Sequence, residues 1–187
     1  MKKLLTLRNV ILCAAFIVVL VTFILSFSAT FTCDFPHRNY HNIIWGTNKS
    51  SSEGYVYIFE KAYPAAALLL VGTILMIVGA VAAAVVSLFV KKPWAKWVVI
   101  GLAAIIVTGA IFQFFTLESF ARAQLIDETI EMPVSPQEFT QMLKTRMQAY
   151  KEMGWYCNET TANGILGIIA GLAVAATPFV PNKGLLK

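Results

Sequence analysis

The sequence predicts an all-α membrane protein, in which a bundle of four transmembrane helices carries a small outer domain. Hydrophobic residues make up 58% of the 187 residues and charged residues 13%, about half the charged share of a soluble domain. Four apolar runs without Asp, Glu, Lys or Arg are each close to the length that a helix needs to cross a bilayer. A fifth stretch has the apolar and polar faces of a water-exposed helix.

We interpret the whole chain, residues 1–187, as a single integral membrane domain. The first run is longer than the apolar core of a signal peptide, so we interpret it as a helix that stays in the membrane. The expected transmembrane helices span about residues 10–28, 64–90, 96–118 and 161–180, and the expected outer loops span about residues 29–63 and 119–160.

The distribution of charge predicts the orientation of these helices. With both termini inside, the inner segments hold eight basic residues and no acidic one, and all ten acidic residues lie outside. The inner basic residues are Lys2, Lys3, Arg8, Lys91, Lys92, Lys96, Lys183 and Lys187. The positive-inside rule therefore predicts cytoplasmic termini, in the plasma membrane or a membrane of the secretory route. The net charge of +5 follows from this topology, and we expect no nucleic-acid partner.

The amphipathic stretch from Ser135 to Cys157 predicts a helix in the second outer loop. Ser135 and Glu138 match a capping box, and Pro136 stands at the first helical position. Gly154 is the expected end of the helix. The apolar residues recur every three or four positions, and we predict that they form an outer interaction face: Phe139, Met142, Leu143, Met147 and Tyr150.

The first outer loop contains two runs typical of strands. Asn42 to Trp45 and Tyr55 to Glu60 are rich in β-branched and aromatic residues and are separated by polar residues and Gly54, which predicts a short β-hairpin. An isolated hairpin is marginally stable in water, so we expect it to rest on the apolar face of the amphipathic helix. We also expect the third transmembrane helix to project beyond the membrane and to form a helical hairpin with the amphipathic one.

Small residues at four-residue spacing predict where the transmembrane helices pack closely. One ladder lies in the second helix and one in the fourth, and such residues let helix backbones approach in lipid. The fourth-helix ladder serves this bundle or, alternatively, a second copy of the chain. The ladder residues are Gly79, Ala83 and Ser87, and Gly167, Gly171 and Ala175.

Two cysteines border the membrane on the outer, oxidising side. Cys33 follows the first helix and Cys157 precedes the fourth, which predicts a disulfide between them. A competing interpretation uses Cys33, His37 and His41, spaced by four, as zinc or copper ligands. Pro36 interrupts any helix there, which disfavours the metal site. We predict no cofactor. Bound lipid is compatible with an integral membrane protein.

Two outer tripeptides match the glycosylation sequon. Asn48-Lys49-Ser50 and Asn158-Glu159-Thr160 both fall in the expected outer loops, where such sequons are modified in a secreted or surface protein. Asn48 and Asn158 are therefore glycosylation candidates.

Nothing in the sequence matches a catalytic motif. It has no glycine-rich phosphate loop, no zinc-protease helix and no nucleophile elbow, and the apolar runs carry none of the ionisable groups typical of pumps and voltage sensors. The inner segments are short. We therefore expect a protein without enzymatic activity.

Inner termini, a short inner turn and two outer loops together resemble the tetraspan membrane proteins, meaning the claudin-like, tetraspanin and MARVEL groups. The resemblance is to architecture over the whole chain. Trp45-Gly46 matches part of the W-GLW motif of claudins, with Cys33 as the one cysteine of that loop, and Cys157 stands alone where tetraspanins carry Cys-Cys-Gly.

The resulting functional hypothesis is a non-enzymatic tetraspan protein that acts as an accessory or assembly subunit of a larger membrane protein complex. Its partners are membrane lipid and other integral membrane proteins, in a hetero- or homo-oligomer. The first alternative is a homo-oligomeric channel or a junction-forming protein of claudin-like architecture. The second is a metal-dependent membrane enzyme subunit that uses Cys33, His37 and His41.

Overall fold

The chain consists of six α-helices and four short strands in the part that the structure, a computed structural model, describes. It describes residues 6–33, 39–42, 47–50, 54–57, 59–90, 92–129, 134–152, 154 and 156–181, with the backbone alone for those between 31 and 64 and for residues 124, 127 and 128.

Four of the helices are long and apolar enough to cross a membrane. They are α1 (Leu7–Ser28), α2 (Phe59–Phe89), α3 (Ala95–Phe114) and α6 (Asn158–Ala176), the last followed by the short 3-10 helix η1 (Thr177–Phe179). Their surfaces carry large exposed apolar side chains that suit contact with lipid. The structure thus confirms the prediction of an integral, multi-pass membrane protein built on a four-helix bundle.

The starts of three helices differ from the predicted ones. α1 begins at Leu7 and α6 at Asn158, each about one turn early. α2 begins at Phe59, so Pro64, where the sequence predicts this helix to begin, lies in its second turn. The added residues are more polar than the spans that they precede, and a search for apolar runs does not detect them.

The chain groups into two compact units. The first comprises Met1–Ile24, Val71–Phe112 and Ala162–Lys187, and the second comprises Leu25–Leu70 and Gln113–Thr161. The sequence predicts one integral membrane domain. The second unit gathers the segments that it assigns to the outer loops, together with the helix ends that border them.

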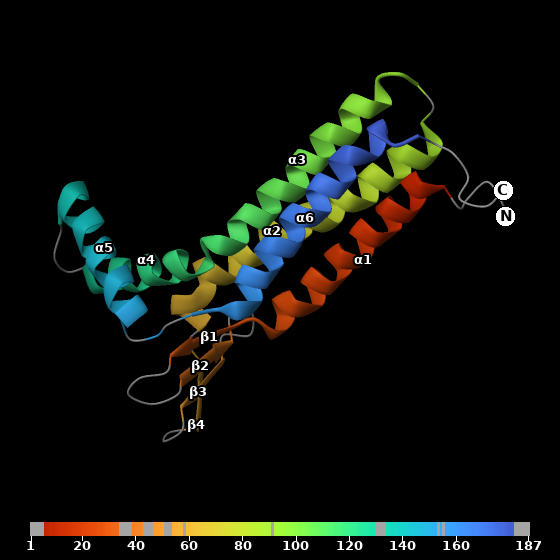
Figure 1. Cartoon of the computed structure of the whole chain (residues 1–187). Coiled ribbons are helices and arrows are strands. Elements are labelled where there is room, and N and C mark those ends of the chain that lie inside the picture. The colour runs from red at the N-terminus through yellow and green to blue at the C-terminus, as the bar shows by residue number, and fades with distance from the viewer. Residues whose placement is uncertain are drawn as a thin grey trace. The chain divides into compact units, whose positions relative to one another are not determined.

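The first unit is a bundle in which α1, α2, α3 and α6 run side by side (Figure 1). Small side chains dominate its core, which allows close approach of helix backbones. The fully or nearly fully buried residues of this core are Leu12, Ala15, Val19, Met76, Ala80, Ala83, Val99, Ala103, Ile106, Ala110, Ala170 and Val174.

The second unit contains two further helices, α4 (Thr116–Thr129) and α5 (Pro136–Glu152), which contact each other. This contact confirms the predicted helical hairpin. Its core unites these helices with the start of α2 and the segment around Cys157, and consists of Ala29, Ala65, Ala66, Leu69, Phe120, Ala121, Leu125, Leu143, Tyr150 and Cys157.

α4 is separated from α3 by a break at Phe115, whereas the sequence predicts one continuous helix that crosses the membrane to about residue 118 and projects beyond it. The hydroxyl of Thr116 donates to the carbonyl of Gln113 at 2.8 Å, which competes with the helical hydrogen-bond ladder. The buried side-chain amide of Gln113 donates to the Leu69 carbonyl at 3.2 Å. These bonds stabilise the break between α3 and α4 at a position where the apolar pattern of the sequence continues.

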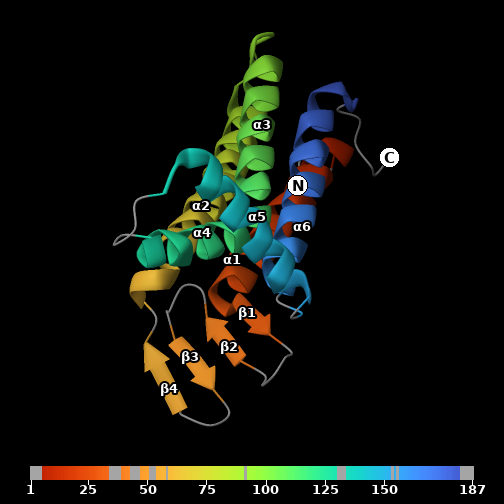
Figure 2. The ribbon, with the colours of Figure 1, turned by 90° about the vertical axis from the view of Figure 1, so that its left-hand side faces the viewer.

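The four strands form one antiparallel sheet in the order β1-β2-β3-β4 (Figure 2). They are β1 (Thr30–Cys33), β2 (Asn39–Asn42), β3 (Thr47–Ser50) and β4 (Gly54–Tyr57), with Thr30 opposite Asn42 and Thr47 opposite Tyr57.

This sheet replaces the two-stranded hairpin that the sequence predicts. The predicted second strand runs to Glu60, but β4 ends at Tyr57 and α2 begins at Phe59. The predicted first strand, Asn42 to Trp45, overlaps β2 at Asn42, and its residues 43–45 lie outside the described part of the chain. The predicted packing of this hairpin on the apolar face of α5 involves strand side chains that the structure does not describe, so it stays a prediction.

Candidate functional site

The apolar face of α5, predicted as an outer interaction face, is largely used within the second unit. Leu143 and Tyr150 are 7% and 6% exposed and belong to its core. Phe139 and Met147 are partly buried against the same cluster, while Met142 is 39% exposed. Four of these five side chains therefore stabilise the fold, and this face alone offers a partner little apolar surface.

A groove of about 570 Å³ lies between α4 and α5. Both helices contribute to it, and its lining combines buried apolar atoms with exposed charged and amide groups. Its residues are Glu118 and Arg122 of α4 and Thr140, Leu143, Lys144, Met147, Gln148 and Lys151 of α5. The groove thus begins where the packed side of α5 meets its polar side.

Positive charge predominates in this groove. Arg122 forms an ion pair with Glu118, with 3.3 Å between Nη2 and Oε1. Both side chains are exposed, so this pair contributes only roughly 0.3–0.5 kcal/mol to stability. Lys144 and Lys151 are seven residues apart and so lie on one face of α5. Neither lysine has an ion-pair partner in the part of the chain that the structure describes.

The amide of Gln148 lies between these lysines in sequence. Its Nε2 donates to Glu152 Oε1 at 3.0 Å, which leaves the amide oxygen as an acceptor. The groove therefore offers three cations, one carboxylate and one amide beside the apolar atoms of Leu143 and Met147. Such a set suits a ligand that is both acidic and apolar.

Met142 lies in a second hollow, of about 370 Å³. This hollow is also lined by Leu125 of α4 and by Gln141, Thr145, Arg146 and Ala149 of α5. Met142 is the one exposed residue of the predicted interaction face, whose other four members are buried or partly buried.

The small-residue ladders of α2 and α6 face other helices of the first unit. A methyl group added to Gly79 would lie 2.7 Å from the side chain of Ile106, and one added to Gly171 would lie 2.6 Å from Val107. Gly167 is equally tight against Met76 and Ala110. Among the other ladder residues, Ala83 is buried and Ser87 and Ala175 are partly buried.

The proposed metal ligands do not share a helix. Cys33 ends β1 and His41 belongs to β2, and these strands pair antiparallel, so the helical spacing on which the metal interpretation depended is wrong. His37 lies outside the described residues, as do the side chains of the other two. No group of three potential ligands occurs among the side chains that are described.

Cys157 is a free, buried thiol in this structure. Its Sγ donates to Glu159 Oε2 at 3.7 Å, and the Thr160 and Thr161 hydroxyls donate to its carbonyl. Burial raises the pKa of this thiol to about 11, so it is protonated at neutral pH. Because the side chain of Cys33 is not described, the disulfide between them stays a prediction.

The two sequons occupy regular structure. Asn158 is the exposed first residue of α6, and Thr160 beside it is buried. Asn48 belongs to β3, with its backbone alone described. Glycosylation of either asparagine stays a prediction.

The fold and these surfaces define a four-span integral membrane protein with a second unit of two helices and a small sheet. Comparison of the chain with protein-family models, with curated protein sequences and with solved structures finds no match.

Sequence reasoning singled out Leu143 and Met147 but missed the charged residues that line the groove with them. Lys144 and Lys151 stand on the polar side of α5 at a spacing of seven, which was a visible signal. Arg122 comes from another helix, and only the contact between α4 and α5 brings it into the groove with them.

Proposed function

We propose that the protein is a non-enzymatic accessory or assembly subunit of a larger membrane protein complex, and that it binds its partner through the α4–α5 groove. The supporting observation is the lining of this groove, which includes Arg122, Lys144 and Lys151 as well as Leu143 and Met147. We infer a partner segment that carries acidic side chains next to apolar ones. Complementary charge would steer its approach, and apolar contact would slow its release.

The topology of the proposal comes from the sequence. The predicted inner segments hold only basic charges, so the termini are cytoplasmic and the α4–α5 groove lies outside, in the plasma membrane or a membrane of the secretory route. A partner segment is then an extracellular or lumenal part of another integral membrane protein. Glycans at Asn48 and Asn158 belong to the same outer-side proposal.

Charge neutralisation tests the groove directly. The variant Lys144→Gln/Lys151→Gln removes two positive charges from it, while Gln137→Glu/Gln141→Glu changes the net charge of the same helix by the same amount outside it. The probe is a fluorescent peptide of alternating Glu and Leu, titrated by anisotropy onto the purified full chain. We expect about tenfold weaker binding for the first variant, and weaker binding to the unchanged chain at higher salt.

Equal affinity of both variants, or binding insensitive to salt, contradicts the groove. The wider proposal has its own test in native mass measurement after gentle solubilisation. A stable monomer without any partner protein contradicts an accessory subunit.

The alternative of a homo-oligomeric channel or junction-forming protein has less support. It relied on the α6 ladder as a contact between copies, but Gly167 and Gly171 lie against Met76, Ala110 and Val107 of the same chain. An oligomer would need a different face. Reconstitution that yields conductance, together with a homo-oligomeric mass, would favour this alternative over the accessory subunit.

A further inference from the structure

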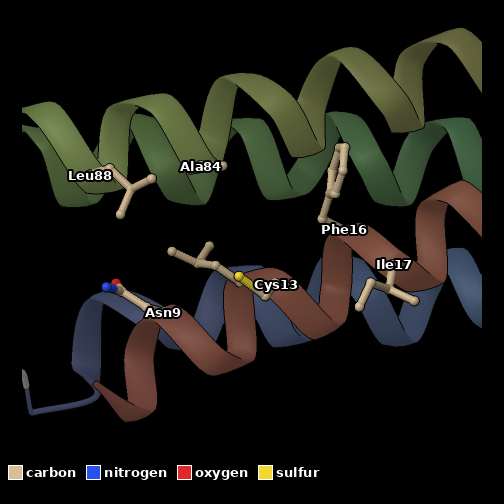
Figure 3. A pocket seen from close by; sticks show the side chains of 7 residues that line it. Asn9, Cys13, Phe16, Ile17, Ala84 and Leu88 are labelled. Atoms are coloured by element: carbon tan, nitrogen blue, oxygen red, sulfur yellow. The ribbon is translucent and has the colours of Figure 1, made fainter. Parts of the chain in front are cut away.

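A pocket of about 300 Å³ lies between α1 and α2 in the first unit. α1 contributes Asn9, Leu12, Cys13, Phe16 and Ile17, and α2 contributes Ala84 and Leu88. Figure 3 shows Leu88 and Ala84 on α2 across from Asn9 and Cys13 on α1. All seven residues belong to helices long and apolar enough to span the membrane.

Hydrocarbon is the natural occupant of such a pocket. Its lining is apolar except for the amide of Asn9 and the thiol of Cys13, and apolar cavities do not hold water. At about 30 Å³ for each water-sized group, the volume suits about ten methylene groups. This capacity matches most of one acyl chain, and not a second one.

Two polar residues are sequence neighbours of Asn9 and Leu88, which lie at one end of the pocket (Figure 3). Arg8 precedes Asn9 in α1, and Ser87 precedes Leu88 in α2. Both Arg8 Nε and Ser87 Oγ are buried and lack a hydrogen-bond partner in the structure, which describes both residues. A buried, unsatisfied polar atom calls for an explanation such as an unseen ligand group. A phosphate or ester oxygen would accept from Arg8 and from the serine hydroxyl.

We propose that this pocket binds one acyl chain of an anionic phospholipid whose phosphate group lies at Arg8. Lipid tails are as apolar as the pocket lining, so the chain site alone gives little preference over bulk lipid. The selectivity comes from the headgroup, because the planar fork of the arginine side chain matches a phosphate. The pocket fixes the position of the lipid.

The test uses the full chain in mixed nanodiscs of phosphatidylglycerol and phosphatidylcholine with identical chains, followed by native mass spectrometry. We expect one phosphatidylglycerol retained per chain, about tenfold in preference to phosphatidylcholine. Arg8→Gln should abolish this preference, and Lys92→Gln, which removes an exposed charge outside the pocket, should leave it. Equal loss in both variants would mean a diffuse charge effect and would overturn the site.

The binding of the acyl chain is tested by its own pair of matched variants. Ala84→Phe fills the pocket, whereas Ala104→Phe adds the same ring at an exposed position of α3. The first should lower retention about tenfold, and the second should not. Unchanged retention with Ala84→Phe, or equal loss in both, refutes the pocket.

Cys13 gives a readout that needs no variant. It lines the pocket, so bound phosphatidylglycerol should slow its reaction with a membrane-permeant maleimide relative to phosphatidylcholine alone. Equal rates in the two lipids would count against occupancy.

Discussion

Ser135 and Glu138 bind each other's backbone at the start of α5. The amide of Ser135 donates to Glu138 Oε2 at 2.8 Å, and the amide of Glu138 donates to Ser135 Oγ at 3.3 Å. Each side chain thus satisfies an amide that the helix itself leaves without an acceptor. The capping box predicted from the sequence is confirmed, and it fixes where the helix beside the groove begins.

Loss of the cap should destabilise the second unit. Ser135→Ala removes the acceptor for the Glu138 amide, and caps of this kind contribute about 1 kcal/mol. We expect a lower melting temperature by circular dichroism in detergent. The control is Thr145→Ala, because that exposed hydroxyl bonds only to the Gln141 carbonyl within the helix and should be nearly neutral. A Ser135→Ala protein as stable as the control variant would contradict the role of the cap.

The same pair makes stability depend on pH. The bonds from the Ser135 backbone and hydroxyl lower the pKa of Glu138 below its ordinary value of 4.5. A carboxyl with a lowered folded-state pKa stabilises the fold above the unfolded-state pKa, and this contribution is lost as the pH falls through the folded-state pKa.

Thermal unfolding of the wild-type protein and Glu138→Gln measures this contribution. The wild type should be more stable at pH 7, and the difference should shrink steadily below about pH 4.5. A difference that is constant from pH 7 to pH 3 would show that the charge of Glu138 plays no part.

The buried and exposed residues of α5 should respond differently to truncation. Leu143 is 7% exposed and Met142 is 39% exposed. Leu143→Ala should cost about 3 kcal/mol, as a cavity in a packed core does, and Met142→Ala should cost well under half of that. Chemical denaturation of the second unit's helices measures both. Equal, small costs would mean that Leu143 is free for a partner, as the sequence first suggested.

Local patterns made the helices predictable. An uncharged run of sufficient length identifies a membrane span, and the capping box depends on two residues three positions apart. The break between α3 and α4 has no such local signal. It involves Gln113 and the Leu69 carbonyl, which are 44 residues apart in sequence.

The sheet and the groove were missed for the same physical reason. β1 and β2 are four residues each and contain Asn, His and Thr rather than a long β-branched run, so their pairing rather than their composition defines them. The role of α5 depends on α4: amphipathicity predicted its apolar face, but only the contact with α4 shows that Leu143 is internal and that Lys144 borders a groove.

Two glycines of α3 should respond in opposite ways to alanine. A methyl group at Gly109 would meet the Gly72 carbonyl oxygen and Met76, whereas one at Gly101 meets nothing within 4 Å. Gly109→Ala should destabilise the bundle by about 1–3 kcal/mol. Gly101→Ala should be neutral or stabilising by up to about 1 kcal/mol, since alanine favours a helix. Melting temperatures in one detergent compare the pair, and a Gly109→Ala protein as stable as Gly101→Ala would refute this close packing.

The thiol of Cys157 should be protected in the folded protein. Burial raises its pKa to about 11, so at pH 7.5 almost none of the reactive thiolate is present. We expect a soluble maleimide to leave Cys157 unmodified in the folded chain and to modify it after denaturation without any reductant, as peptide mass analysis would show. Cys157→Ser is the control for assignment of the peptide. Modification only after reduction would identify the Cys33–Cys157 disulfide that the sequence predicts, and would contradict a free thiol at this position.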